Sequence, residues 1–181
     1  MEAGIETLEC GASQGNASRK VALLLKREQL LYDIRNYCYV EGHIMEGGEG
    51  EMSHSVQDVG EIGNVDRVTR VLDVAFADIV ERLHPMTRRD ITVPLQDDRL
   101  RERKVYGVML QVPNDYSQTT VNLLGKLIHE LLVTTAVADW LSITHPPKAG
   151  VWREKAEAVM TRIGQIRNRR QGRSRLRPRW L

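Results

Sequence analysis

Residues 117–143 carry apolar side chains at helical spacing and contain no proline. Asp115 and Ser117 can cap the start of this helix, and the two prolines after His145 end it. The helix is long enough to span a membrane, but four polar or charged side chains would make burial in lipid costly: Lys126, His129, Glu130 and Asp139. We therefore expect the core helix of a soluble protein and no contact with a membrane.

One side of this helix changes character along its length. Its first half carries a polar stripe: Asn122, Lys126 and His129. Apolar residues continue the same stripe in the second half: Val133, Val137 and Trp140. Because a helix with two apolar sides needs two sets of neighbours, we expect these three residues at a boundary with other elements or with another subunit.

A second helix is predicted from Ala17 or Ser18 to Met45. One arc of it forms a core face: Leu23, Leu30, Leu31, Ile34, Tyr37 and Cys38. A second apolar stripe lies on a different side: Val21, Leu25, Tyr32 and Tyr39. Burial between two helices of the same bundle and packing on a partner both explain this stripe. Tyr32 and Tyr39 join Val133, Val137 and Trp140 as candidate residues of a subunit interface.

The rest of the chain adds two helices and a hairpin. Gly47–Gly50 breaks the chain, and the segment to Gly63 is polar and is expected to be flexible. Asn64 can cap a helix over Val65–Leu83, whose apolar positions recur every three or four residues over five turns. Residues 91–95 and 105–112 predict two strands around a charged turn at 96–104, with Pro94 at a sheet edge. A last helix, Val151–Asn168, has a narrow apolar seam: Trp152, Ala156, Val159, Ile163 and Ile166.

These elements predict a mainly α fold, a four-helix-type bundle with a β-hairpin insertion at about residues 90–112. The bundle occupies residues 19–168. It follows a flexible N-terminal leader, residues 1–18, and precedes an extended basic C-terminal arm, residues 169–181. One domain with tails is the natural expectation for 181 residues.

Charge divides the chain unevenly. Residues 148–181 carry eleven Lys or Arg and two Asp or Glu, a net charge of +9, whereas residues 1–147 carry a net charge of −7. An acidic body with a basic tail favours self-association, or a tail that binds a polyanion or an acidic partner. Two cysteines without metal-ligand spacing and an acidic N-terminus without an apolar run predict synthesis in a reducing cytoplasm.

No motif in the sequence predicts an enzyme, a metal site or a cofactor. The five histidines lie outside the usual metal-ligand frames, and His129 and Glu130 diverge by about 100° on a helix. The glycines from Gly42 to Gly50 lack the strand, helix and Gly-Lys-Ser/Thr ending of a phosphate-binding loop. We predict a non-enzymatic protein.

The C-terminal segment has the most distinctive chemistry of the chain. Seven arginines lie between Arg167 and Arg179, and Trp180 and Leu181 follow them. Guanidinium groups suit both phosphates and carboxylates, so a nucleic-acid tail, a solubilising tail and a docking peptide are all open. The mixture of arginine with apolar residues favours an extended docking peptide whose apolar side chains fill pockets. Its residues are Arg173, Arg175, Leu176, Arg177, Pro178, Arg179, Trp180 and Leu181.

The order of helices, hairpin and basic tail resembles that of head–tail connector proteins of tailed bacteriophages, also called adaptor or ring proteins. Two segments, residues 30–45 and 60–83, resemble the ring proteins of crAss-like phages of gut bacteria. The similarity covers about residues 28–180, in pattern and order rather than in a diagnostic motif, and the leader has no counterpart. The resemblance implies a ring, a dodecamer, beneath the portal, and it implies that the C-terminal arm docks on the portal protein.

We therefore expect a structural virion protein at the head–tail junction that binds itself, the portal and the next tail or ring component. Its ring would leave a channel through which DNA passes without sequence-specific binding. The alternative is a cytosolic nucleic-acid-binding protein that uses the arginine-rich tail.

Overall fold

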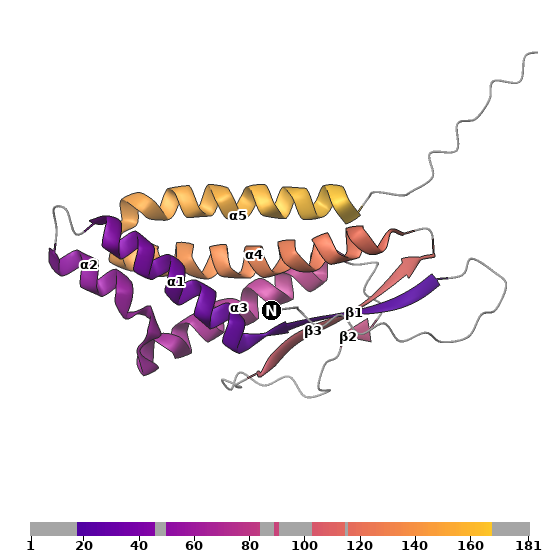
Figure 1. Ribbon diagram of the computed structural model, residues 1–181, viewed down its shortest axis with the longest axis horizontal. Helices are drawn as coiled ribbons and strands as arrows, with labels where there is room; N and C mark the ends of the chain where they lie inside the picture. The colour runs from indigo at the N-terminus through magenta and orange to yellow at the C-terminus, as the bar shows by residue number, and fades with distance from the viewer. Residues whose placement is uncertain (1–17, 46–49, 84–88, 91–102, 115, 168–181) are drawn as a thin grey trace, which may run out of the picture.

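The computed structural model describes residues 18–45, 50–83, 89–90, 103–114 and 116–167 (Figure 1). Most of these residues are helical, and a small antiparallel sheet lies at one end of the molecule. The prediction of a mainly α fold is therefore confirmed. The elements in chain order are β1 (Ser18–Lys26), α1 (Arg27–Met45), α2 (Gly50–Gln57), a 3-10 turn (Asp58–Gly60), α3 (Ile62–Leu83), β2 (Arg89–Asp90), β3 (Val105–Pro113), α4 (Gln118–Thr144) and α5 (Pro146–Arg167).

Helix α4 is the centre of the fold, as its apolar pattern predicted. It packs against α5, α3 and α1, and nearly half of its residues are buried. Ser117 occupies the N-cap position but makes no side-chain hydrogen bond to the helix. By length and composition α4 could cross a membrane, yet 61% of its most apolar window is buried inside the chain. A mostly buried core helix passes the same test of length and composition.

The N-terminal part of the predicted second helix is a strand. Residues 18–26 form β1, in which Val21, Leu23 and Leu25 are buried and alternate with more exposed residues. This alternation has the period of a strand, since successive side chains point to opposite faces. β1 pairs antiparallel with β3 from Ser18 opposite Pro113 to Lys26 opposite Val105. The helix predicted from residue 17 or 18 therefore begins only at Arg27.

The sheet has the order β1-β3-β2. β3 confirms the second predicted strand of the hairpin, and β2 pairs with it through Arg89 opposite Met109 and Asp90 opposite Val108. The predicted first strand, residues 91–95, and most of the turn lie outside the described residues. A hairpin alone is marginal in stability, and pairing of β3 with β1 supplies the additional strand that a stable sheet needs.

The segment before α3 is helical, which corrects the prediction of a flexible stretch up to Gly63. Helix α2 and the following 3-10 turn pack against α1, with Val56 and Val59 buried. Helix α3 begins at Ile62, three residues earlier than predicted, and buries the expected face, including Leu72 and Phe76. Its opposite face carries the exposed Arg70.

Helix α5 begins at Pro146, in the first turn where proline is tolerated, and runs antiparallel along α4 (Figure 1). Trp152, Ile163 and Ile166 of the predicted seam are buried, and Ala156 and Val159 are partly buried against the core. Helix α4 therefore packs between α5 and α3.

Candidate interaction surfaces

The described residues contain no group of three or more His, Cys, Asp or Glu side chains that could hold a metal ion. His129 Nε2 lies 2.7 Å from Asp33 Oδ2, and both side chains are about one quarter exposed. Neither residue lines either of the two hollows described below. This pair joins α4 to α1 and is a structural contact between the two helices.

A second polar cluster joins α5 to α1. Lys148 Nζ lies 2.5 Å from Glu41 Oε2, and the Trp152 indole N–H donates to Glu41 Oε1 at 3.3 Å. The Lys155 ammonium lies 4.6 Å from the Trp152 ring centroid and 5.0 Å from that of Tyr37. These contacts hold α5 in place and leave the carboxylate of Glu41 paired.

Three of the five predicted interface residues are interior residues of the single chain. Val133, Val137 and Trp140 are 1%, 0% and 7% exposed. The Trp140 indole N–H donates a hydrogen bond of 2.9 Å to the carbonyl of Val56, so α2 covers this part of α4. The neighbours that the apolar stripe required are therefore elements of the same chain, and these three residues offer no surface to another subunit.

The two tyrosines, in contrast, are on the surface. Tyr32 is 65% and Tyr39 is 58% exposed on the outward side of α1, and the Tyr39 ring stacks on His43. Two further apolar residues of α1, Val40 and Ile44, are also exposed. We call Tyr32, Tyr39, Val40 and Ile44 the α1 surface. Tyr32 and Tyr39 share one side of α1, and Val40 and Ile44 lie about 80–120° further round the helix. Exposed aromatic and aliphatic side chains on one helix are typical of an interaction surface.

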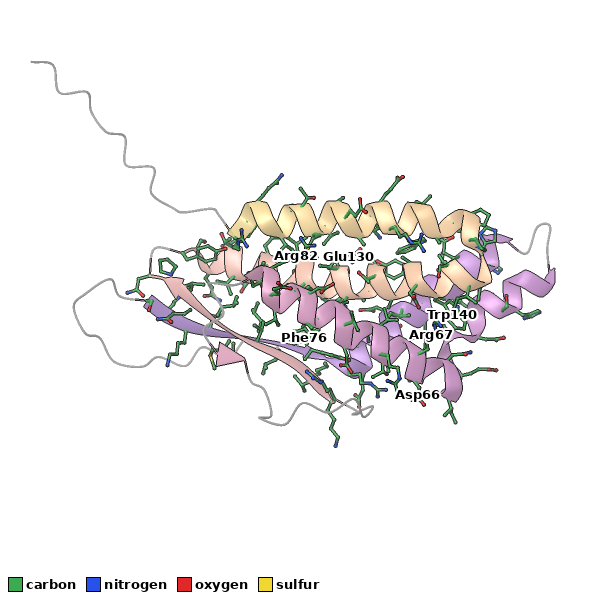
Figure 2. The ribbon with its side chains drawn as sticks, turned by 180° about the vertical axis from the view of Figure 1, so that it is seen from behind. Asp66, Arg67, Phe76, Arg82, Glu130 and Trp140 are labelled. Atoms are coloured by element: carbon green, nitrogen blue, oxygen red, sulfur yellow. The ribbon has the colours of Figure 1, made fainter. Side chains whose placement is uncertain are left out.

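A second surface lies on the other side of α4, where α3 faces the viewer in Figure 2. Residues of α3, α4 and α5 line two open hollows of about 370 and 340 Å³, and both hollows have Val71, Thr135 and Asp139 in their lining. Arg67 pairs with Asp139 at 3.1 Å near one end of them. Val74 is 66% exposed at the rim. The sequence predicted one apolar and one polar face for α3 and did not predict this patch. Val71 and Val74, which lie outside the main apolar series, are the residues that could have indicated it.

The two ends of the described chain, the start of β1 and the end of α5, lie at the same end of the molecule, which we call the Tyr116 pole (Figure 1). The Arg19 guanidinium donates to the carbonyl of Tyr116 at 2.9 Å, and the Tyr116 hydroxyl donates to the carbonyl of Ile166 at 3.0 Å. Burial of Tyr116 raises the pKa of its hydroxyl, which keeps it a donor. The start of β1 and the end of α5 are thus fastened to the same residue (Figure 1).

The predicted docking arm lies outside the described residues, so its assignment stays a prediction for all eight named residues, which lie among the nine positions from Arg173 to Leu181. The same holds for residues 1–17 of the predicted leader and for Asp115.

Comparison of the chain with known protein families, characterised proteins and solved structures gives no match.

Proposed function

We propose that this chain is a structural, non-enzymatic protein of a tailed-phage virion. In the proposal it forms a ring beneath the portal, a dodecamer by its resemblance to head–tail connector proteins, joins the head to the tail and leaves a channel for DNA. Helices α1, α3, α4 and α5 are the bundle, and residues 169–181 are the extended arm. The partners are other copies of the chain, the portal protein and the next tail component.

One observation carries the proposal: Tyr116 is hydrogen-bonded both to the start of β1 and to the end of α5, so the two ends lie together. The strongly basic residues 168–181 follow α5 in the sequence, and residues 1–147 carry a net charge of −7. A connector needs one defined end from which a docking segment reaches the neighbouring ring. Arginine and tryptophan are the residues most often found at the energetic centre of protein interfaces, and the segment contains both.

The α1 surface supports the self-association that a ring requires. Cyclic rings use two different patches on each copy, and exposed tyrosines are common in such patches. Helix α1, which carries the exposed Tyr32 and Tyr39, lies on one side of α4 and helix α3 lies on the other (Figures 1 and 2). Helix α1 can therefore meet a neighbour without disturbing the core.

A nucleic-acid-binding protein is the second candidate, because seven arginines lie between Arg167 and Arg179. The two functions place different demands on the segment. Protein docking needs the apolar anchors as much as the charges, whereas phosphate binding depends mainly on the charges and falls steeply with salt.

The deciding variant is Trp180→Ala with Leu181→Ala, which keeps every arginine. We expect it to lose binding to purified portal protein and to yield heads without tails in electron micrographs. The matched control replaces Arg173, Arg175, Arg177 and Arg179 by glutamine and keeps the apolar pair.

Unchanged portal binding after removal of residues 173–181 would refute the docking assignment. If only the glutamine variant lost its partner, and if that partner were DNA bound with a steep salt dependence, the nucleic-acid function would replace the proposal.

A further inference from the structure

The outward face of α3 has a charge pattern that is symmetric about Val74. Arg70 lies four residues before Val74 and Asp78 four residues after it; Arg67 and Glu81 lie seven residues before and after. Positions at spacings of four and seven share one side of a helix, so these residues surround Val74 on one face. The first half of this face is basic and the second half is acidic.

The central residue of this face is apolar and largely exposed. Val74 is 66% exposed, and Val71 and Ala77 flank it three residues away on either side. Within the described residues Arg70, Asp78 and Glu81 form no salt bridge, whereas Arg67 already pairs with Asp139 at 3.1 Å. The surface therefore offers an apolar centre and charged groups on both sides of it.

This arrangement is complementary to itself. A two-fold axis that passes through Val74, perpendicular to α3, brings each residue opposite the residue equally far on the other side of Val74. Arg70 of one copy then faces Asp78 of the second copy, Arg67 faces Glu81, and Val71 faces Ala77. Parallel packing of two α3 helices would instead place Arg70 beside Arg70.

We propose that the chain forms a two-fold dimer in which the α3 helices of two copies pack antiparallel, with Val74 on the axis. Each charge pair occurs twice in this dimer, and the apolar rim of the hollows is covered by the second copy. The contact lies across α4 from the α1 surface. It is thus separate from the proposed ring contact, and it does not depend on the proposed function. Because a two-fold axis joins copies of opposite orientation, the dimer is a contact of the chain outside that ring.

Charge exchange tests the pairing in the full-length protein. Arg70→Asp places two carboxylates opposite each other at both symmetric positions, and Asp78→Arg does the same with two guanidinium groups. We expect either single change to weaken dimerisation roughly tenfold or more in sedimentation equilibrium at low salt, because two attractive pairs become repulsive. The double variant Arg70→Asp with Asp78→Arg restores both pairs and should restore the dimer.

Both positions are on the surface, so circular dichroism should show an unchanged fold in every variant. A double variant that stays as weak as the single ones would overturn the proposal, and so would a wild-type chain that remains monomeric up to millimolar concentration.

Cross-linking tests the position of the axis. With helix axes about 8–10 Å apart, the two Val74 Cα atoms lie about 3.5–5.5 Å from each other, and the upper part of this range is within reach of a disulfide. The two Ala77 Cα atoms are about 9 Å apart along the helix direction alone, which is too far. In a Cys10→Ser background, Val74→Cys should therefore give a covalent dimer on mild oxidation and Ala77→Cys should not. Equal cross-linking of both variants, or of neither, contradicts the two-fold axis at Val74.

Discussion

At the residue scale, burial controls the ionisation of Cys38. Its side chain is 0% exposed on the inner side of α1. Burial raises the pKa of the thiol from 9.0 to about 12, and the Glu41 carboxylate adds to the effect. The folded chain therefore keeps this thiol protonated at any physiological pH, and a protonated thiol is a poor nucleophile and metal ligand. Cys38 is a core residue.

Stability at alkaline pH follows from this pKa. In the unfolded chain the Cys38 thiol loses its proton near pH 9, whereas in the folded chain it does so near pH 12. Between these values the unfolded state binds fewer protons, so the free energy of unfolding falls as pH rises, by at most about 1.4 kcal/mol per pH unit. Well below pH 9 the thiol contributes no pH dependence.

Urea melts of the wild type and of Cys38→Ala between pH 8 and 10 measure this effect. We expect the alanine variant to be less stable at pH 8 because of its small cavity, yet to lose less stability between pH 9 and 10. Identical slopes would contradict the assignment. The buried Tyr106, whose pKa is also raised by burial and by the Asp73 carboxylate, adds a similar loss above pH 10 in both proteins.

At the scale of elements, a hydrogen bond joins α2 to α4, in addition to the packing of α2 against α1. The Trp140 indole N–H donates to the carbonyl of Val56 near the end of α2. Trp140→Phe keeps most of the apolar packing but leaves that carbonyl without its partner. We expect a loss of about 1–3 kcal/mol in stability and faster amide hydrogen exchange over residues 50–60 than over α5.

Trp152→Phe is the matched control, because its indole N–H makes only a longer bond of 3.3 Å to Glu41, which Lys148 also holds. Exchange that accelerates equally in α2 and α5 for both variants would show that Trp140 does not act through α2.

Elements were predictable from the sequence where periodicity and caps agree. Helix α4, the buried face of α3, the seam of α5 and strand β3 follow from their spacing. Strand β1 was not predictable in this way. The apolar run 21–25 fits both a helix and a strand, and no glycine or proline separates it from α1. Its pairing with β3, some eighty residues later, decides the conformation, and local pattern contains no information about that partner.

The candidate surfaces were predictable only in part, for a related reason. Apolar spacing identified Val133, Val137 and Trp140 as residues with neighbours, but it could not say that α2 contacts Trp140, because residues 50–60 look polar. The hollows between α3 and α5 depend on how three helices, α3, α4 and α5, are placed relative to one another. No single stretch of sequence encodes that relation.

At the scale of the whole molecule, the exposed fraction of a side chain distinguishes residues that stabilise the fold from residues that can contact another copy. Tyr32→Glu with Tyr39→Glu introduces charge on the exposed α1 surface. We expect the proposed ring to be lost while the fold remains, as measured by light scattering together with circular dichroism. Charged groups in the centre of an interface are strongly unfavourable because they lose their hydration.

Val137→Glu serves as the contrast, because Val137 is 0% exposed in the single chain. A carboxylate there has no partner and should unfold the chain rather than release a folded monomer. A folded Val137→Glu monomer, or an intact ring of the tyrosine variant, would contradict this division.

The pairing of β1 with β3 also sets the order of events on the ribosome. Leu23 and Leu25 emerge early, but the strand that covers their edge is made roughly eighty residues later, after about 4–16 s at 5–20 residues per second. During that interval the nascent chain carries an apolar strand with an unpaired edge, which invites pairing with other nascent chains. Chains translated close together on one messenger therefore meet when their first strands are open, and fast translation of residues 27–113 favours the correct partner.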